Sequence, residues 1–413
     1  MMRSLSFVLC LLAPGFAPPA HAQALGAAGS SAAAAVAADS IAAATPPAAA
    51  PATPAGQTPA PEPSAPLAAP FASSLPGAGA SITNPAISVI GWFQGAAGGD
   101  RTAQASAFEL REAELGFQAA VDPFTRADFF LSAGPAGLEV EEGFITWLAL
   151  PAGGQSRVGR FRADLGKFNR THPPETPFAD RPLATVAFYG EEGLTTDGVA
   201  LSTLVPNPLD LYWDVVANVG TIPGAGESPV FLADTRSDLL ALGRTSVFVP
   251  LRQSADLNLG ASYANARADS ALRAGGPRAQ LATLDLTFHW KNPRRSIYRS
   301  LFAQVEWTAE QGSRSGAART GGGFAFAIWQ FARQWKLGAR WDRTASPGDR
   351  ASTSGALVLV QYQPSEFSTL SVQGRRVRAP AVPSTGAYPD GRDRDAVFFK
   401  WTFNIGPHGA HSY

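Results

Sequence analysis

Apolar and polar residues alternate along most of the chain from Ala86 to the C-terminus, in segments that polar turns separate. Every second residue from Leu301 to Trp307 is apolar, and polar residues such as Gln304 and Glu306 stand between them. The same pattern returns in residues 284–290, 335–342 and 397–405. Because successive side chains of a strand point to opposite faces, a period of two predicts strands with one apolar and one polar face.

About sixteen such segments follow one another. They begin near residues 86, 105, 124, 138, 155, 197, 209, 238, 254, 280, 299, 320, 334, 353, 366 and 393. Most run for about nine to twelve residues, the length that a tilted strand needs to cross a membrane, whereas strands of globular proteins usually run for about five to six. We therefore predict an all-β fold, a transmembrane antiparallel up-and-down β-barrel of about sixteen strands. A soluble β-sandwich is the alternative, and it would have to bury all the apolar faces against one another.

The connections between these segments alternate in length. Those after even-numbered segments are mostly short, at 121–124, 150–154, 206–208, 250–254, 291–298, 332–333 and 364–366. Those after odd-numbered segments are mostly longer, at 164–196, 222–237, 266–279, 311–319 and 378–392. Short turns at one rim and long loops at the other are typical of bacterial outer-membrane barrels, in which the short turns are periplasmic. An even number of strands then predicts that both chain ends are periplasmic.

One segment breaks the alternation. The apolar parity of residues 108–121 changes between Leu110 and Leu115, across Arg111 and Glu112. A β-bulge that redirects the strand is the simplest explanation.

The first 83 residues have a different texture. A basic start at Arg3, a short apolar run from Phe7 to Leu12 and small residues up to Ala22 predict a cleaved signal peptide over residues 1–22. The lone cysteine, Cys10, lies inside it, so no disulfide is expected in the mature chain. Residues 23–83 are rich in Ala and Pro and nearly free of charge, which predicts a flexible periplasmic segment. The barrel is then expected to take up residues 84–413.

At about sixteen strands, the lumen of a barrel is wide enough for a water-filled channel. The polar positions expected to face it carry both signs of charge: Asp128, Glu139, Glu141, Arg160, Arg162, Asp214, Asp256, Asp285, Glu306, Lys336, Arg340, Asp342, Arg375 and Lys400. Acidic and basic residues number 33 each over the whole chain, which gives no reason to expect nucleic acid as a partner. The expected partners are outer-membrane lipid and small hydrophilic solutes or ions.

The long connection 164–196 is the strongest candidate for a functional element, because loops of that length in compact domains are usually functional. It combines aromatic residues, prolines and charges of both signs. Two arrangements remain open: the loop folds inward and narrows the channel, or it forms a compact cap on the outer rim. The candidates for lining the pore or its constriction are Arg160, Arg162, Lys167, Arg170, Arg181, Glu191, Glu306, Arg340 and Asp342.

Short motifs in this region resemble those of known barrels. Residues 158–162 and 165–168 resemble a strand and the following loop of the phosphate-selective porins, and residues 169–172, 180–183 and 190–194 resemble related barrels labelled zinc-regulated or TonB-dependent outer-membrane receptors. The resemblance implies a porin-like barrel without enzymatic activity, and a homotrimer as its assembly. The chain departs from the phosphate-selective porins, since acidic residues balance its arginines in number. It departs from the TonB-dependent receptors, since residues 24–80 are too simple in composition for a plug domain.

Few residues of the sequence are candidates for binding a metal or for catalysis. His408 and His411 in the C-terminal tail are weak candidates for metal ligands, but a closed zinc site needs about four, and we predict no metal or cofactor. A hydrolase would need a nucleophile and a base, and His289 beside Asp285 and Thr287 is the best-placed base. The predicted function is a passive diffusion channel for small hydrophilic solutes or ions, with loop 164–196 as its constriction. The alternatives are a receptor or transporter for a metal or another ligand, and a barrel-borne hydrolase.

Overall fold

A computed structural model describes residues 85–99, 107–135, 137–223, 228–232, 236, 238–252, 254–268, 278–312, 319–345, 351–379 and 392–406. The predicted signal peptide 1–22, the Ala/Pro-rich segment 23–83, and His408 and His411 lie outside these residues. Among the described residues, no helix has both the length and the apolar character needed to cross a membrane.

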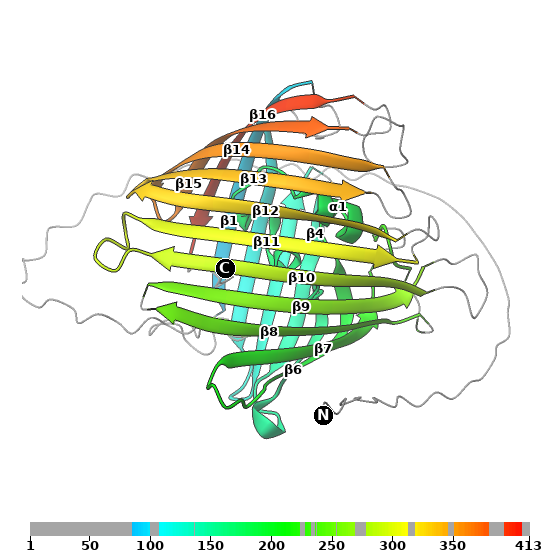
Figure 1. The fold of residues 1–413 in the computed structure, drawn as a ribbon. Helices are drawn as coiled ribbons and strands as arrows, with labels where there is room; N and C mark the ends of the chain where they lie inside the picture. The colour runs from blue at the N-terminus through cyan, green and yellow to red at the C-terminus, as the bar shows by residue number, and fades with distance from the viewer. Residues whose placement is uncertain are drawn as a thin grey trace, which may run out of the picture. The chain divides into compact units, whose positions relative to one another are not determined.

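Sixteen antiparallel strands form a closed barrel (Figure 1). They are β1 (Ala86–Gly98), β2 (Glu109–Ala120), β3 (Thr125–Gly134), β4 (Gly137–Trp147), β5 (Gln155–Arg162), β6 (Thr195–Leu204), β7 (Tyr212–Thr221), β8 (Leu240–Arg252), β9 (Ala255–Arg267), β10 (Arg278–Lys291), β11 (Ser300–Gln311), β12 (Thr320–Ala332), β13 (Trp335–Ala345), β14 (Ser352–Ser365), β15 (Ser368–Arg378) and β16 (Arg394–Ile405). Each strand pairs with its neighbours in sequence, and β1 pairs with β16 to close the ring. The predicted barrel is confirmed, and the largest shift of a strand start is at β2, expected near residue 105.

The distribution of apolar and polar side chains over the two faces of the wall is the reverse of that in a soluble protein. Trp307 and Trp341 point outward and are 47% and 48% exposed, whereas the inward Glu306 and Asp342 beside them are 2% and 1% exposed. An apolar outer surface around a polar interior suits a lipid environment, and closure of the ring satisfies the backbone hydrogen bonds that lipid cannot.

Two β-bulges adjust which side chains face inward. The predicted bulge in β2 is confirmed, because Trp92 of β1 pairs with Glu112 whereas the next residue, Phe93, pairs with Leu110. A second bulge lies in β4, where Glu142 pairs with Phe130 and Val140 pairs with Leu131. Glu141 is the extra residue between them. The bulge therefore brings two consecutive glutamates to the inner side of the wall.

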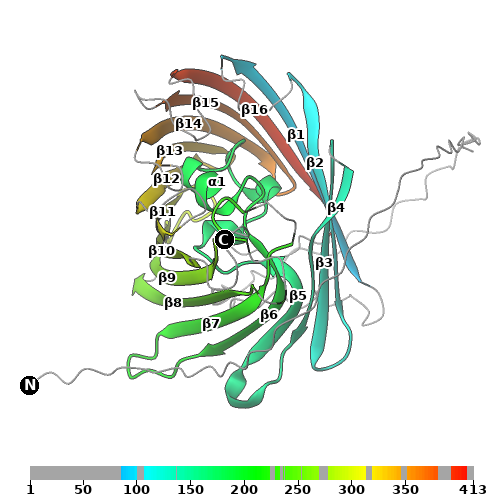
Figure 2. The same cartoon turned by 90° about the vertical axis from the view of Figure 1, so that its right-hand side faces the viewer.

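Connections at one rim are short, and most of those at the other rim are longer. The exception is the tight connection between β3 and β4 at the long-loop rim, where only residues 135 and 136 separate the strands. The connection between β5 and β6 is the longest described in full, and it holds η3 (Phe168–Arg170), η4 (Pro173–Glu175) and α1 (Leu183–Tyr189). A further short helix, η2 (Pro151–Gly153), lies in a turn at the opposite rim. Figure 2 shows α1 inside the ring of strands, so the β5–β6 loop takes the inward arrangement and not that of an outer cap.

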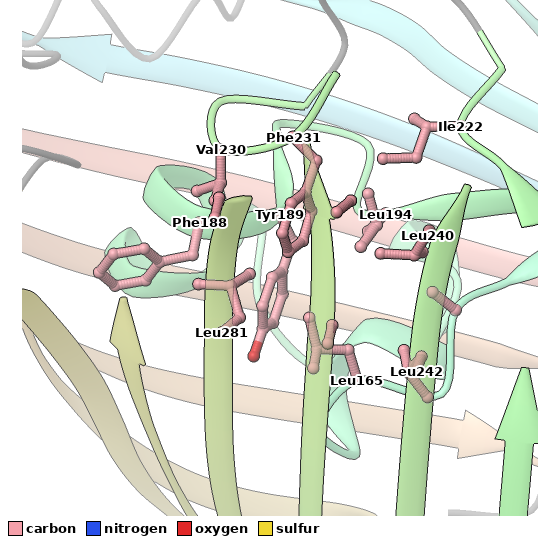
Figure 3. Close-up of a cluster of buried hydrophobic side chains, with 14 of the residues drawn as sticks. Leu165, Phe188, Tyr189, Leu194, Ile222, Val230, Phe231, Leu240, Leu242 and Leu281 are labelled. Atoms are coloured by element: carbon pink, nitrogen blue, oxygen red, sulfur yellow. The ribbon is translucent and has the colours of Figure 1, made fainter. Parts of the chain in front are cut away.

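An apolar cluster anchors this loop to the wall near the long-loop rim (Figure 3). From the loop, it includes Leu165, Phe188, Tyr189 and Leu194; from strands β8 and β10, it includes Leu240, Leu242 and Leu281. Val230 and Phe231, from the connection between β7 and β8, are almost fully buried in the same cluster. Burial of a large apolar side chain contributes about 1.5–3 kcal/mol, so the cluster holds α1 firmly against the wall.

Candidate functional site: the loop inside the barrel

The two ends of the β5–β6 loop are joined by one buried side chain. Asn169 donates hydrogen bonds to the carbonyls of Ala163 and Leu194 at 2.9 and 2.8 Å, and its own carbonyl accepts one from the backbone N–H of Leu194 at 2.8 Å. The backbone N–H of Ala163 also donates to the carbonyl of Leu194 at 2.9 Å. The loop is thus closed at its neck and enters the lumen as a folded unit.

Beyond the neck, the chain passes directly over Glu306 of β11. The backbone N–H groups of Lys167 and Phe168 donate to one carboxylate oxygen of Glu306 at 3.0 and 3.1 Å. Gly166 has a φ of +67°, and a Cβ atom there would stand 2.4 Å from Glu306. Glycine is therefore required at 166, both for its backbone conformation and for the close approach to the wall.

Lys400 of β16 holds the middle of the loop. Its Nζ donates to the carbonyls of Pro173, Thr176 and Phe178 at 3.2, 2.7 and 3.0 Å, which uses all three of its N–H donors. The ammonium also lies 4.2 Å from the ring centroid of Trp92. Lys400 therefore serves the structure of the loop and does not face open lumen.

Asp180 makes the next attachment, to β13 and β15. Arg340 donates to both carboxylate oxygens of Asp180 at 3.1 and 3.0 Å, and Arg375 donates to one of them at 2.5 Å. Burial would raise the pKa of Asp180, but the two guanidinium groups outweigh burial and lower it. Asp342 accepts from Arg340 at 2.9 Å and from the backbone N–H of Leu183 at the start of α1 at 3.3 Å.

Beyond the closing pair of strands β1 and β16, His172 reaches the wall formed by β2 and β4. Its Nδ1 lies 2.8 Å from Glu114 and 2.9 Å from Glu141, and its Nε2 lies 2.8 Å from Glu142. The imidazole is completely buried. Burial would lower the pKa of His172, but the surrounding carboxylates, Glu114 first, raise it well above its usual value. The charged imidazolium therefore ties the loop to three carboxylates.

The same residues include the one group among those described whose ligand atoms are close enough to hold a metal ion: Glu114, Glu141 and His172, all within 4.8 Å. The distances of 2.8 and 2.9 Å from Nδ1 to the two carboxylates are those of charge-assisted hydrogen bonds. Arg162 donates to the same oxygen of Glu141 at 2.6 Å, so that carboxylate already has a cationic partner. The arrangement fits a protonated histidine better than a metal.

The nine predicted pore residues fall into distinct groups. The expectation that Arg160 lines the lumen is wrong: it lies on the outward face with Val158 and forms a two-point ion pair with Asp197 of β6, at 2.8 and 2.9 Å. Strand alternation ends at Arg162, whose side chain turns inward to the loop. Glu191 is exposed on the loop after α1. Arg162, Arg181, Glu306, Arg340 and Asp342 are buried against or within the loop.

Arg181 and Arg162 both donate to the carbonyl of Glu192, at 3.0 and 2.5 Å. They hold the return of the loop towards β6, so their role is structural. Lys167 and Arg170 remain as the partly exposed basic groups of the loop. Burial lowers the pKa of Lys167 to about 8, although Asp285 of the wall opposes the shift.

The residues considered for a hydrolase do not come together. Asp285 is bound by Arg244 at 2.7 and 2.9 Å, and Thr287 is completely buried. The nearest polar partner of His289 is Asp256 of β9, at 2.9 Å from its Nδ1. The ring of His289 also stacks on Phe302, with centroids 4.8 Å apart. His289 shares the inward face of β10 with Asp285 and Thr287, as expected, but its polar partner is Asp256.

Comparisons with known proteins agree with this architecture. No family model matches the chain. An uncharacterised protein of Aquifex aeolicus is 27% identical over 347 residues, which cover 74% of this chain and 70% of that protein. The anion-selective porin of Comamonas acidovorans superposes with a TM-score of 0.50 at 13% identity, over 78% of this chain and 100% of that one. The trimer form of OmpT, an outer-membrane protein of Vibrio cholerae, gives 0.51 at 8% identity, over 78% and 100%. The chain shares the barrel fold of these outer-membrane proteins.

Proposed function

We propose that the protein is a porin of the bacterial outer membrane, a passive diffusion channel for small hydrophilic solutes or ions. The observation that carries the proposal is the β5–β6 loop, which stands inside a closed barrel and is attached to opposite sides of its wall, by His172 at β2 and β4 on one side and by its backbone contacts with Glu306 of β11 on the other. Asp180 and Lys400 attach it to the strands between, β13, β15 and β16. A loop held in this way narrows the lumen without being free to swing out of it.

The charges near the loop suit a selective constriction. Lys167 and Arg170 project from the loop, and acidic residues such as Asp256 stand on the wall. Charged side chains in a narrow pore tune its ion preference. Selectivity for phosphate is not proposed, because the arginines of the interior are largely held by acids such as Asp180 and Asp285.

Orientation and assembly follow from the same proposal. Both chain ends lie on the periplasmic side and the long loops face the cell exterior, as in other barrels with an even number of strands and short periplasmic turns. A homotrimer is the proposed assembly, and the trimer form of Vibrio OmpT, which shares the fold, supports it. Outer-membrane lipid and the permeating solutes are the proposed partners.

The two other functions have less support. A receptor for a metal would need a free ligand set, whereas the histidine–glutamate group of the lumen is engaged in fixing the loop. A hydrolase would need a nucleophile beside His289, and the described residues bring Asp256 there.

Swelling of liposomes that hold the purified protein tests the proposal. Light scattering after addition of uncharged sugars of increasing size should show rapid entry of the small sugars and exclusion of the large ones. Protein-free liposomes give the baseline. If sugars of all sizes stay outside liposomes that contain correctly folded barrel, the loop closes the lumen to such solutes, and passive diffusion of small hydrophilic solutes is excluded.

A further inference from the structure

The outer surface of the wall changes character along β13 and β15. The outward residues of β13 are apolar up to Trp341, and Arg343 follows. Those of β15 are apolar or small up to Gly374, and Arg376 and Arg378 follow. All three arginines are exposed and lie at the long-loop end of their strands. The basic residues therefore begin where the apolar band ends.

The strand register places two of these arginines in one row. Arg343 is opposite Ser354 of β14, and Ser354 is opposite Arg378. Directly opposite residues have Cβ atoms about 4.5–5.5 Å apart, so the two arginines start about 10 Å apart, on either side of a serine hydroxyl. Their long side chains can converge on a group placed over the serine.

The next row towards the middle of the barrel indicates how deep in the membrane the arginines lie. It contains Trp341, Ala356 and Arg376 in register. Tryptophan is enriched at the boundary between the hydrocarbon layer and the headgroups. Trp341 thus marks the boundary on this part of the wall, and the row of Arg343, Ser354 and Arg378 lies on its headgroup side.

The charges of this patch are weakly satisfied by the protein. Arg376 stands 3.6 Å from Asp393 and 3.8 Å from Asp395, and all three side chains are about half exposed or more. Such ion pairs are worth little, because water screens them. No ion pair within the part of the chain that the structure describes includes Arg343 or Arg378.

We propose that Arg343, Ser354 and Arg378, with Arg376 behind them, bind the phosphate group of a lipid headgroup in the leaflet at the long-loop rim. The planar guanidinium group binds phosphate oxygens through two parallel hydrogen bonds, and basic residues next to a membrane attract anionic lipid. The proposal assigns a lipid site to the outer wall, separate from the channel within.

Retention of phosphatidic acid by the full-length protein in detergent micelles tests the proposal, with native mass spectrometry to count bound lipid over a titration. The double variant Arg343→Ala/Arg378→Ala should bind about thirtyfold more weakly, since each basic residue near a membrane surface contributes roughly a factor of five. Arg343→Lys/Arg378→Lys should be intermediate, because it keeps the charge and loses the paired hydrogen bonds.

The matched control is Arg294→Ala/Arg295→Ala, which removes two exposed arginines from the turn between β10 and β11 at the opposite rim. It should leave retention unchanged. Equal binding of phosphatidic acid by Arg343→Ala/Arg378→Ala and by Arg294→Ala/Arg295→Ala would overturn the proposal. So would retention of diacylglycerol, which lacks the phosphate, equal to that of phosphatidic acid. A change in oligomeric state without a change in lipid binding would show a contact between copies of the chain instead. None of these readouts depends on conductance, so failure of the channel proposal is distinguishable.

Discussion

His172 is the residue on which one side of the loop depends. Its imidazolium is the only group of the loop that contacts three wall carboxylates among the described residues, and it is fully buried. Removal of one partner from a buried ion pair leaves charges without compensation, which usually destabilises a protein by about 3–5 kcal/mol.

The variant His172→Gln should therefore lower the thermal unfolding midpoint of the barrel markedly. The matched control, His289→Gln, changes a partly exposed lumen histidine that pairs with one carboxylate, Asp256, and stacks on Phe302, and it should cost less than about 1 kcal/mol. Because the pKa of His172 is raised, its contribution is complete below pH 6.5 and is lost only as pH rises through that higher pKa. The difference in unfolding midpoint between wild type and His172→Gln should thus persist at neutral pH and shrink at alkaline pH. Equal losses of stability in His172→Gln and His289→Gln would contradict this role.

Lys167 gives a second prediction for a single side chain. Its pKa of about 8 means that it is mostly charged at pH 7 and mostly neutral at pH 9. Reversal potentials in a salt gradient should therefore move towards cation preference over this interval. Lys167→Met should already be shifted at pH 7 and show no step, whereas Lys167→Arg should keep the preference at both pH values. A step of the same size in Lys167→Met would assign the titration to another group.

At the scale of the element, the β5–β6 loop is held by hydrogen bonds that cannot be predicted from the sequence of the loop. Lys400 was expected to face the lumen as one charge among others, yet it binds three loop carbonyls more than two hundred residues away in sequence. An alternating strand predicts that Lys400 points inward and does not predict what will meet it there. The inward fold of the loop, its apolar cluster and the burial of Phe231 depend on such long-range contacts.

Lys400→Met should loosen the loop, because each buried carbonyl left without a donor costs about 1–3 kcal/mol. Ala179, which is buried between the loop and β16, is a suitable reporter position. In a Cys10→Ser background, Ala179→Cys should react with a thiol reagent at least tenfold faster when Lys400→Met is added. Lys336→Met, which changes another inward lysine, is the control and should not alter the rate. Equal rates in all three proteins would show that Lys400 does not hold the loop.

At the scale of the whole molecule, the alternating pattern was enough to predict the number of strands, their order and the inverted distribution of apolar residues. The pattern is local, and each strand repeats it, so errors at one strand do not spread. The bulge in β2 was readable for the same reason. The bulge in β4 leaves the same signal, because the outward apolar residues change from Leu138 and Val140 to Ile145 and Trp147 across Glu141 and Glu142, but it was not predicted. Arg160 was misplaced because it shares the parity of Arg162: the side chain of Arg162, the last residue of β5, turns inward to the loop, whereas Arg160 stays on the outward face opposite Asp197.

The molecule as a whole combines an apolar outer wall, a polar lumen and a loop fixed across that lumen, and the central claim is that water and ions pass beside the loop. Single-channel conductance of the purified protein in a planar bilayer tests this claim most directly. We expect stable open steps in symmetric salt and, in a salt gradient, a reversal potential that shifts towards cation preference between pH 7 and 9. A correctly folded barrel that inserts into the bilayer and shows no steps at any voltage would contradict it.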